Sequence, residues 1–557
     1  MQQYRKPIDS VRFIRHHIPK LKEWFSRKDW TGMNTHKNSD TTSKLSSGFM
    51  EKGHGSVGGE AFAVSDEHGY KVEMPREMSV WSAIGLGLAI MACPYGLSTT
   101  ISIALQNGGP ATVLWGWVFV SLMSICIALS LAEIASRYPT SGGPYYWSYM
   151  LASRRYNTVA SYVVGWLGLI GNWTVSLSII YGTAELIMAI PPLWHPAFEP
   201  QAWQTYLLFL AVLLICFGAN FLKQRQLDAL NTFSIYWTAA SVLIVLVTVL
   251  AMARNGRASG SFVFGGFDVS SGWQPGWAWF VGLLQSAYVL TGYGMVAAMA
   301  DEVANPETSV PRGMVGSVIA AAVTGLLYLI PLLFVMTDMP SLLNADQPIP
   351  VLFQQATGTE GATGLMVLII TIGVLGGIGA LTTSSRTAYS FARDNGIPGS
   401  QWWKVVWREY LPLNALALSS IVIALLGLLS FQSAAFSAFT GVATITLGAS
   451  YAGPILISLL RKREPLEGAV FRMPSWLGFI VNAVCCAWIL LSIVIFCMPT
   501  AVSGLNADTM NYASVVFVFF AAVSFVYYIL HARKGFNGPP ATSHESVDEK
   551  SNSLDKL

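Results

Sequence analysis

The stretch Cys93-Pro94-Tyr95-Gly96 interrupts the middle of a long apolar run, and Thr291-Gly292-Tyr293-Gly294 interrupts another run at a similar depth. Proline removes a backbone donor and glycine relaxes the chain, so both runs are expected to break as helices. Irregular backbone at membrane depth is tolerated only where it is buried or lines a cavity. Breaks at matching places in two halves predict an inverted-repeat transporter whose substrate site lies at the breaks. The alternative is that these residues only mark close helix packing.

Composition places these runs in a membrane protein. Of the 557 residues, 53% are hydrophobic and only 11% are charged, whereas about 25% are charged in a typical soluble protein. This excludes an ordinary soluble enzyme and a disordered chain, and the scattered basic residues indicate no nucleic-acid partner. The six cysteines lie in or beside apolar runs and the eight histidines lie outside them, so we expect no disulfide framework, no zinc site and no cofactor.

Apolar runs of about 20 residues are long enough to cross a bilayer as helices, and twelve such runs occur. They are 80–105, 111–135, 158–187, 203–221, 231–253, 277–300, 314–337, 363–391, 413–430, 434–459, 475–498 and 511–531. The predicted fold is therefore an all-α polytopic membrane protein with twelve transmembrane helices, the first and sixth broken at mid-membrane. We divide it into a first repeat (80–254), a second repeat (277–460) and two extra helices (475–531) within a transporter domain spanning 80–532. Residues 1–79 and 533–557 are expected to be tails, the first of them largely disordered.

The distribution of Lys and Arg predicts the orientation, because loops on the cytoplasmic side carry the excess of these residues. With the N-terminus inside, the outer loops hold only Arg254 and Arg257. The inner loops hold Arg137, Arg154, Arg155, Lys223, Arg225, Arg312, Arg393, Lys404, Arg408, Arg461, Lys462, Arg463 and Arg472. Both termini are therefore predicted to be cytoplasmic.

Three further stretches follow apolar runs and carry a resemblance to a known family. They are SLAEIASRYPTSGGPYYWSYM (130–150), MADEVANPETSVPRGM (299–314) and SRTAYSFARDNGIPG (385–399). All three closely resemble signatures of the amino acid–polyamine–organocation transporter superfamily. Residues 78 to 532, about four fifths of the chain, resemble its fungal amino acid/choline/GABA permease branch.

The resemblance implies a five-plus-five inverted-repeat (LeuT-like) fold and alternating access, with the first and sixth spans cradling a small nitrogenous substrate. It also implies secondary transport with a proton, or alternatively sodium, as the coupling ion. We expect a multi-pass protein of the plasma membrane, with the vacuolar membrane as the alternative.

Charged residues at the predicted cytoplasmic ends of the spans are candidates for a gate. They are Glu133, Arg137, Asp301, Glu302, Arg386 and Arg393. Opposite charges at the membrane boundary can pair when a gate closes and hydrate when it opens. Ordinary solvation of charged helix ends is the alternative.

Candidate substrate-binding residues lie at the breaks and at similar depth in neighbouring spans. They are Cys93, Pro94, Tyr95, Gly96, Asn172, Trp173, Tyr288, Thr291, Gly292, Tyr293, Phe439 and Thr440. The aromatic rings could enclose an ammonium group by cation–π attraction, roughly 0.5–2 kcal/mol each when desolvated, although rings also pack in any helix bundle. Relatives that bind α-amino acids often carry a Gly-Ser/Thr-Gly type loop in the first span. Its absence here weakens the assignment to a standard α-amino acid.

Glu185 is the one acid well inside an apolar run, so it is predicted to couple protons or to balance a cationic substrate. A residue reaching the outer surface is the alternative. Thr382, Thr383, Ser384 and Ser385 could supply oxygens to a sodium ion, although hydroxyls in membrane helices more often bond their own backbone.

The sequence thus favours a proton-coupled or facilitated carrier of amino acids, choline, GABA or related amines. Transport of a fungal alkaloid or its precursor and nutrient sensing without transport are the alternatives. A membrane-embedded enzyme is disfavoured, because no nucleophile with its base and no metal ligands occur at membrane depth.

Overall fold

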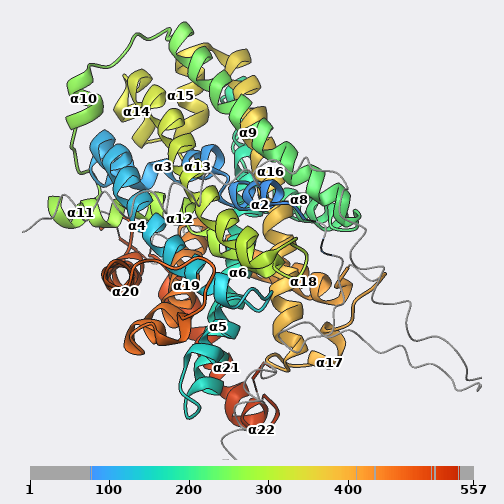
Figure 1. The fold of residues 1–557 in the computed structure, drawn as a ribbon. Coiled ribbons are helices and arrows are strands. Elements are labelled where there is room, and N and C mark those ends of the chain that lie inside the picture. Colours follow the sequence, from blue (N-terminus) through green and yellow to red (C-terminus); the bar gives the residue numbers. More distant parts are fainter. Residues whose placement is uncertain are drawn as a thin grey trace, which may run out of the picture. The chain divides into compact units, whose positions relative to one another are not determined.

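The computed structural model describes Arg76 and residues 78–408, 411–431, 435–502, 505–506, 510–536 and 538–539. Predictions for most of both tails lie outside these residues. The described part of the chain is helical, with isolated β-bridges in place of strands (Figure 1). Twelve of its helices or runs of consecutive helices are long and apolar enough to cross a membrane: Val80–Gln106, Gly109–Arg137, Asn157–Trp194, Ala202–Ala219, Gln224–Met252, Pro275–Met299, Pro306–Val335, Thr359–Arg393, Leu413–Phe431, Phe436–Leu460, Ser475–Phe496 and Ala513–Ala532. The predicted all-α fold with twelve spans is confirmed.

The first span breaks into α2 (Val80–Met91) and α3 (Cys93–Gln106) at Ala92. Ala92 has φ 42° and ψ 48°, a left-handed conformation that ends α2. The break lies one residue before the predicted stretch, because Pro94 needs no N–H at the start of a helix and therefore fits the first turn of α3.

The sixth span breaks as well. It consists of α11 (Pro275–Gly282), α12 (Leu284–Val289) and the 3-10 segment η2 (Gly292–Met299). Leu290 and Thr291 separate α12 from η2. The two predicted breaks are therefore confirmed.

Glycines let the two breaks touch each other. A Cβ on Gly96 would lie 2.8 Å from Cγ2 of Val289, and one on Gly292 would lie 2.5 Å from Cγ2 of Ile90. Each distance is below any normal contact, so neither position accepts a side chain unless its neighbour moves. The first and sixth spans approach each other closely because each brings a glycine to the crossing.

The elements that follow the breaks recur in the second half with inverted direction. In the first half, α4 (Gly109–Arg137) is followed by the short α5 (Pro144–Leu151), and in the second half α13 (Pro306–Val335) is followed by α14 (Met339–Leu343) and α15 (Pro348–Thr357). The short helices α5 and α15 both contact α16 (Thr359–Arg393), but at opposite ends of it. Tyr145 of α5 donates to the carbonyl of Ser390, whereas Gln354 of α15 donates to Thr359.

The helices around the breaks form the interior of the bundle. α2 packs against α9 (Gln224–Met252), α13 and α16, while α6 (Asn157–Met188) packs against α16, α8 (Ala202–Ala219) and α19 (Ala435–Leu460) (Figure 1). The glycines of α16 form a close-packing face. A Cβ on Gly373 would lie 2.7 Å from the Tyr95 ring, and one on Gly376 would lie 2.7 Å from the carbonyl oxygen of Ala89.

The last two spans are α20 (Ser475–Phe496) and the helix formed by α21 (Ala513–Tyr527) with the π-helical η5 (Tyr528–Ala532). The loop before α20 holds a buried ion pair. Nη2 of Arg463 lies 2.5 and 2.6 Å from the two carboxylate oxygens of Glu133 on α4, and the N–H of Met473 also donates to Glu133. Both charged side chains are at most 3% exposed. This pair joins the first repeat to the extra helices.

We predict that Glu133→Ala destabilises the protein strongly, by about 3–5 kcal/mol, because it leaves the Arg463 guanidinium buried without its counter-charge. Glu467 is the matched control, since its pair with Arg472 spans 3.6 Å and its side chain is 73% exposed. Removing an exposed partner costs little. Thermal unfolding of the detergent-solubilised variants measures both, and equal midpoint shifts for Glu133→Ala and Glu467→Ala would contradict the prediction.

Candidate functional site

A small cavity of about 10 Å³ lies where the two breaks meet. We call it the central cavity. Its lining residues come from both broken spans and from α6: Ile90, Met91, Ala92, Tyr95, Gly96, Val175, Ile179, Tyr288, Val289 and Gly292. None of these described lining residues is acidic. The structure therefore brings together four of the predicted substrate residues, Tyr95, Gly96, Tyr288 and Gly292.

Hydrogen bonds to α6 hold the two tyrosines at the central cavity. The Tyr95 hydroxyl donates to the carbonyl oxygen of Ile179 at 2.7 Å, and the Tyr288 hydroxyl donates to Oγ of Ser178 at 2.8 Å. Both rings are buried. Because their donors are directed into α6, each ring is fixed with its apolar surface beside the breaks.

A second cavity, of about 30 Å³, lies beside η2 between residues 141–145, α6, α16 and α19. Asn172, Gly294 and Tyr451 are among the residues that line it. Of the predicted substrate residues only Asn172 lines this second cavity. The hydroxyl of Tyr451 donates to the carbonyl oxygen of Thr291, and its ring lies 5.5 Å from the Tyr293 ring.

The remaining predicted substrate residues line neither cavity. Cys93 and Pro94 are buried in the first turn of α3, and the hydroxyl of Thr291 donates to the carbonyl of Ala287. Two others contact neighbouring helices: Trp173 donates to Ser419 of α18 (Leu413–Gly427), and Phe439 packs edge-on against Tyr181. Thr440 donates to the carbonyl of Ser437 in its own helix.

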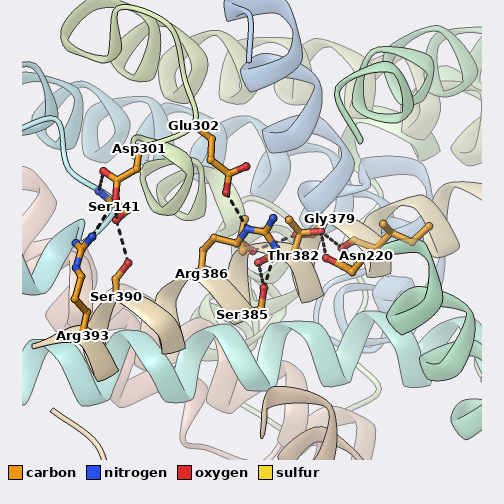
Figure 2. A network of polar contacts seen from close by, with 12 residues as sticks. Ser141, Asn220, Asp301, Glu302, Gly379, Thr382, Ser385, Arg386, Ser390 and Arg393 are labelled. Carbon is orange, nitrogen blue, oxygen red and sulfur yellow. Dashed lines mark hydrogen bonds and ion pairs between the residues drawn. The ribbon is translucent and has the colours of Figure 1, made fainter. Parts of the chain in front are cut away.

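One end of the bundle holds a cluster of acid–arginine contacts made by Asp301, Glu302, Arg386 and Arg393. We call this end of the bundle the basic end. Consecutive acids after η2 pair with two arginines of α16 (Figure 2). Nε of Arg386 lies 3.0 Å from Oε1 of Glu302, with both side chains at most 3% exposed. Nη1 of Arg393 lies 3.4 Å from Oδ2 of Asp301, with exposures of 16% and 24%.

Neighbouring residues add further contacts to these pairs at the basic end. Ser141 donates its hydroxyl and its N–H to Asp301, and its Oγ lies 3.0 Å from Oγ of Ser390 (Figure 2). Met78 forms a parallel bridge with Val303, in which the N–H of Met78 donates to the carbonyl of Glu302 and the N–H of Ala304 donates to that of Met78. The chain just before α2 is thus tied to the acidic segment.

Two of the predicted gate residues lie apart from these pairs. Glu133 belongs to the joint with Arg463, and the Arg137 guanidinium lies over the Tyr138 ring at 5.8 Å. The pairing of Glu133 with Arg463 and the places of Ser141, Ser390 and Tyr451 in the site were not predicted from the sequence. For Ser141 a signal was present, because Pro139-Thr140-Ser141-Gly142-Gly143 is a sequence typical of turns.

The four hydroxyls of the predicted sodium site all donate to other groups. Thr382 donates to Oδ1 of Asn220, while Thr383 and Ser385 donate to backbone carbonyls of their own helix. Ser384 donates to the carbonyl oxygen of Asn172. The Arg386 guanidinium donates to Oγ of Ser385 (Figure 2), so a fixed cation already lies beside these oxygens. Among the described residues, no group of three or more His, Cys, Asp or Glu side chains is placed to hold a metal ion.

Glu185 lies near the end of α6 that is opposite the basic end. Its Oε2 accepts a long hydrogen bond, 3.5 Å, from Nε2 of Gln347. A carboxyl group therefore lies on the side of the central cavity away from the arginines.

Comparison with known proteins shows which family this chain belongs to. A family model described as amino acid permease matches residues 78–520. The chain is 33% identical to a polyamine transporter of Saccharomyces cerevisiae, over 83% of this chain and 76% of the relative. It is 32% identical to a choline transporter of the same yeast, over 87% of each chain, and 31% identical to an amino-acid permease of Arabidopsis thaliana, over 85% of this chain and 95% of the relative.

These relatives are permeases and transporters rather than enzymes, and they confirm the resemblance inferred from the three motifs. With its twelve apolar helices and a match over most of its length, this chain is a multi-pass integral membrane protein that belongs to the amino acid permease family of the amino acid–polyamine–organocation superfamily.

Proposed function

We propose that this chain is a secondary carrier that moves a small amine or amino acid across a membrane by alternating access. The observation that supports this most directly is the meeting of two broken spans at a cavity, with ion pairs closing one end. Broken helices expose backbone N–H and C=O groups that can bind the charged groups of a substrate.

The substrate class follows from the chemistry at the breaks. The relatives' names include a polyamine transporter, a choline transporter and an amino-acid permease, and all of these compounds carry a positively charged ammonium nitrogen at neutral pH. Tyr95 and Tyr288 present two fixed rings, each contributing about 0.5–2 kcal/mol to a desolvated cation. Carbonyl groups at the ends of α2 and α12 add partial negative charge. We infer that the central cavity enlarges to hold the amine nitrogen between these rings.

The basic end acts as the cytoplasmic gate in this proposal, because an excess of arginine and lysine marks the cytoplasmic side. Both termini then lie in the cytoplasm, and we assign the protein to the plasma membrane. The gate opens when both acid–arginine pairs separate and hydrate. Leaving either member of the buried Glu302–Arg386 pair unpaired in the interior is costly, so that pair separates only as water enters.

Glu185 is the proposed site of proton coupling. It lies near the end of α6 opposite the gate, where its side chain is partly exposed and a proton from outside can reach it. An ionisable group at membrane depth is commonly part of a proton or ion pathway. Neutralising Glu185 would alter the charge felt by a cationic substrate at the tyrosines.

Transport itself is tested in a yeast strain that lacks its own amine and amino acid carriers. We expect saturable uptake of at least one labelled compound among choline, GABA, polyamines and amino acids, and we expect a protonophore to reduce it. Absence of uptake and efflux for the whole panel, with the protein present in the membrane, would reject the carrier proposal.

We predict that Arg393→Asp lowers uptake several-fold, because it places a second acid beside Asp301, and that adding Asp301→Arg restores part of the loss. The Arg393–Asp301 pair is partly exposed, so the reversed pair can be accommodated. Arg155→Asp is the matched control on an exposed residue of the same end, with near-normal uptake expected. Failure of the double variant to recover would argue against a gate made by this pair.

We predict that Glu185→Gln abolishes the dependence of uptake on external pH and on the proton gradient, because the neutral amide cannot exchange a proton. Asp346→Asn serves as the control, with pH dependence retained. Initial rates between pH 4.5 and 7.5, with and without a protonophore, measure the effect. Unchanged pH-dependent uptake by Glu185→Gln would remove Glu185 from the coupling mechanism.

A further inference from the structure

The second cavity differs from the central cavity in its polarity. Five of its lining side chains donate their hydrogens to groups other than the cavity. Asn172 donates to the carbonyl of Gly168, Ser450 to that of Val164 and Tyr451 to that of Thr291, while Ser141 donates to Asp301 and Tyr145 to Asp394. A hydroxyl oxygen that donates its hydrogen in one hydrogen bond still has lone pairs that can accept another. These side chains therefore present hydrogen-bond acceptors to the cavity.

Asn172 provides the strongest of these acceptors. Its side chain is 5% exposed, and its Oδ1 has no hydrogen-bond partner within the described residues. A buried amide oxygen without a partner costs roughly 1–3 kcal/mol. Such a group is expected to be satisfied by something that enters the cavity.

Asn220, in the same bundle, has hydrogen-bond partners for both its amide nitrogen and its amide oxygen. Its Nδ2 donates to the backbone carbonyl four residues earlier, as that of Asn172 does, but its Oδ1 accepts from Thr382. The two residues share their helical hydrogen bond and differ in the amide oxygen. Asn107, at the end of α3, also has an Oδ1 without a partner in the described residues, so what distinguishes Asn172 is that it lines the second cavity.

Size and position restrict the group that fits. The volume of about 30 Å³ has room for about one water-sized group, which matches an ammonium head rather than a whole amino acid. The cavity extends from Gly294, beside the second break, to Ser141, which bonds Asp301 of the ion-pair cluster. It thus lies between the central cavity and the basic end.

We propose that the second cavity is a separate subsite that takes an N–H donor, the ammonium group of a primary or secondary amine, as the substrate passes between the central cavity and the basic end. Oδ1 of Asn172 accepts one N–H, and the hydroxyl oxygens of Ser450 and Tyr451 offer further acceptors. This inference rests on the proposed carrier function. It divides the route into a ring-lined site that accepts any amine cation and an acceptor-lined site that requires N–H groups.

Quaternary amines provide the discriminating probe, because a trimethylammonium group carries the same charge without any N–H. Ethanolamine and choline form one matched pair, and GABA and its N-trimethyl derivative form another. Inhibition constants are measured on inside-out vesicles containing the full chain, where the compounds reach the basic end first. The labelled substrate is whichever compound the wild-type chain transports.

We expect Asn172→Leu to raise the inhibition constants of ethanolamine and GABA by roughly tenfold or more, as for a lost hydrogen bond to a charged donor. Those of choline and trimethyl-GABA should stay within about twofold. Asn220→Leu is the matched control, since it removes the same helical bond, and it should leave the ratio of each pair unchanged. If Asn172→Leu does not fold, Asn172→Asp serves instead, and it should tighten the primary amines more than the quaternary ones.

The outcomes separate this inference from the carrier proposal. If the wild-type chain transports none of the compounds, the carrier proposal itself fails. If it transports but Asn172→Leu weakens both members of a pair equally, or neither, the cavity is only space for movement of η2 or a site for water, and the subsite is rejected.

Discussion

Backbone N–H and C=O groups in hydrocarbon have no water to bond, so a membrane helix can be interrupted only where protein covers the interruption. In this chain each break covers the other. Gly96 lies against Val289 and Gly292 lies against Ile90, with no room for a side chain at either glycine. The tyrosines fixed by α6, the central cavity and the acids after η2 all take their positions from this crossing. A bulkier residue at either glycine would separate the two spans on which the proposed site is built.

The helices could be predicted because span length and apolar composition are local properties, and the breaks could be located because proline and glycine act locally. Which side chains meet was harder to infer. Asp301 and Glu302 lie beside Arg386 and Arg393, as expected for segments at the same end of the bundle. The partner of Glu133 was missed because Arg463 is 330 residues away, in a loop. Depth alone also selected Trp173 and Phe439, but a residue's depth does not determine which face of the helix it occupies, and both face neighbouring helices.

Charges within the described bundle are used for two different purposes. The Glu133–Arg463 pair fastens α4 to the segment before α20 and has further backbone partners, so it is suited to staying closed. Of the two pairs on α16, Asp301–Arg393 is partly exposed. Oε2 of Glu302, in the other pair, has no hydrogen-bond partner in the described part of the chain. An incompletely paired carboxylate costs less to separate from its partner, which suits the gate proposed above.

The bridge between Met78 and Val303 has a consequence for the kinetics of that closure. Its two backbone hydrogen bonds connect the residue that precedes α2 to the acids that follow η2. These segments belong to different repeats, and displacement of either one alone would break both bonds. If the basic end opens as proposed, the opening is therefore expected to be cooperative, with the two half-helices leaving as one rigid body instead of fraying independently.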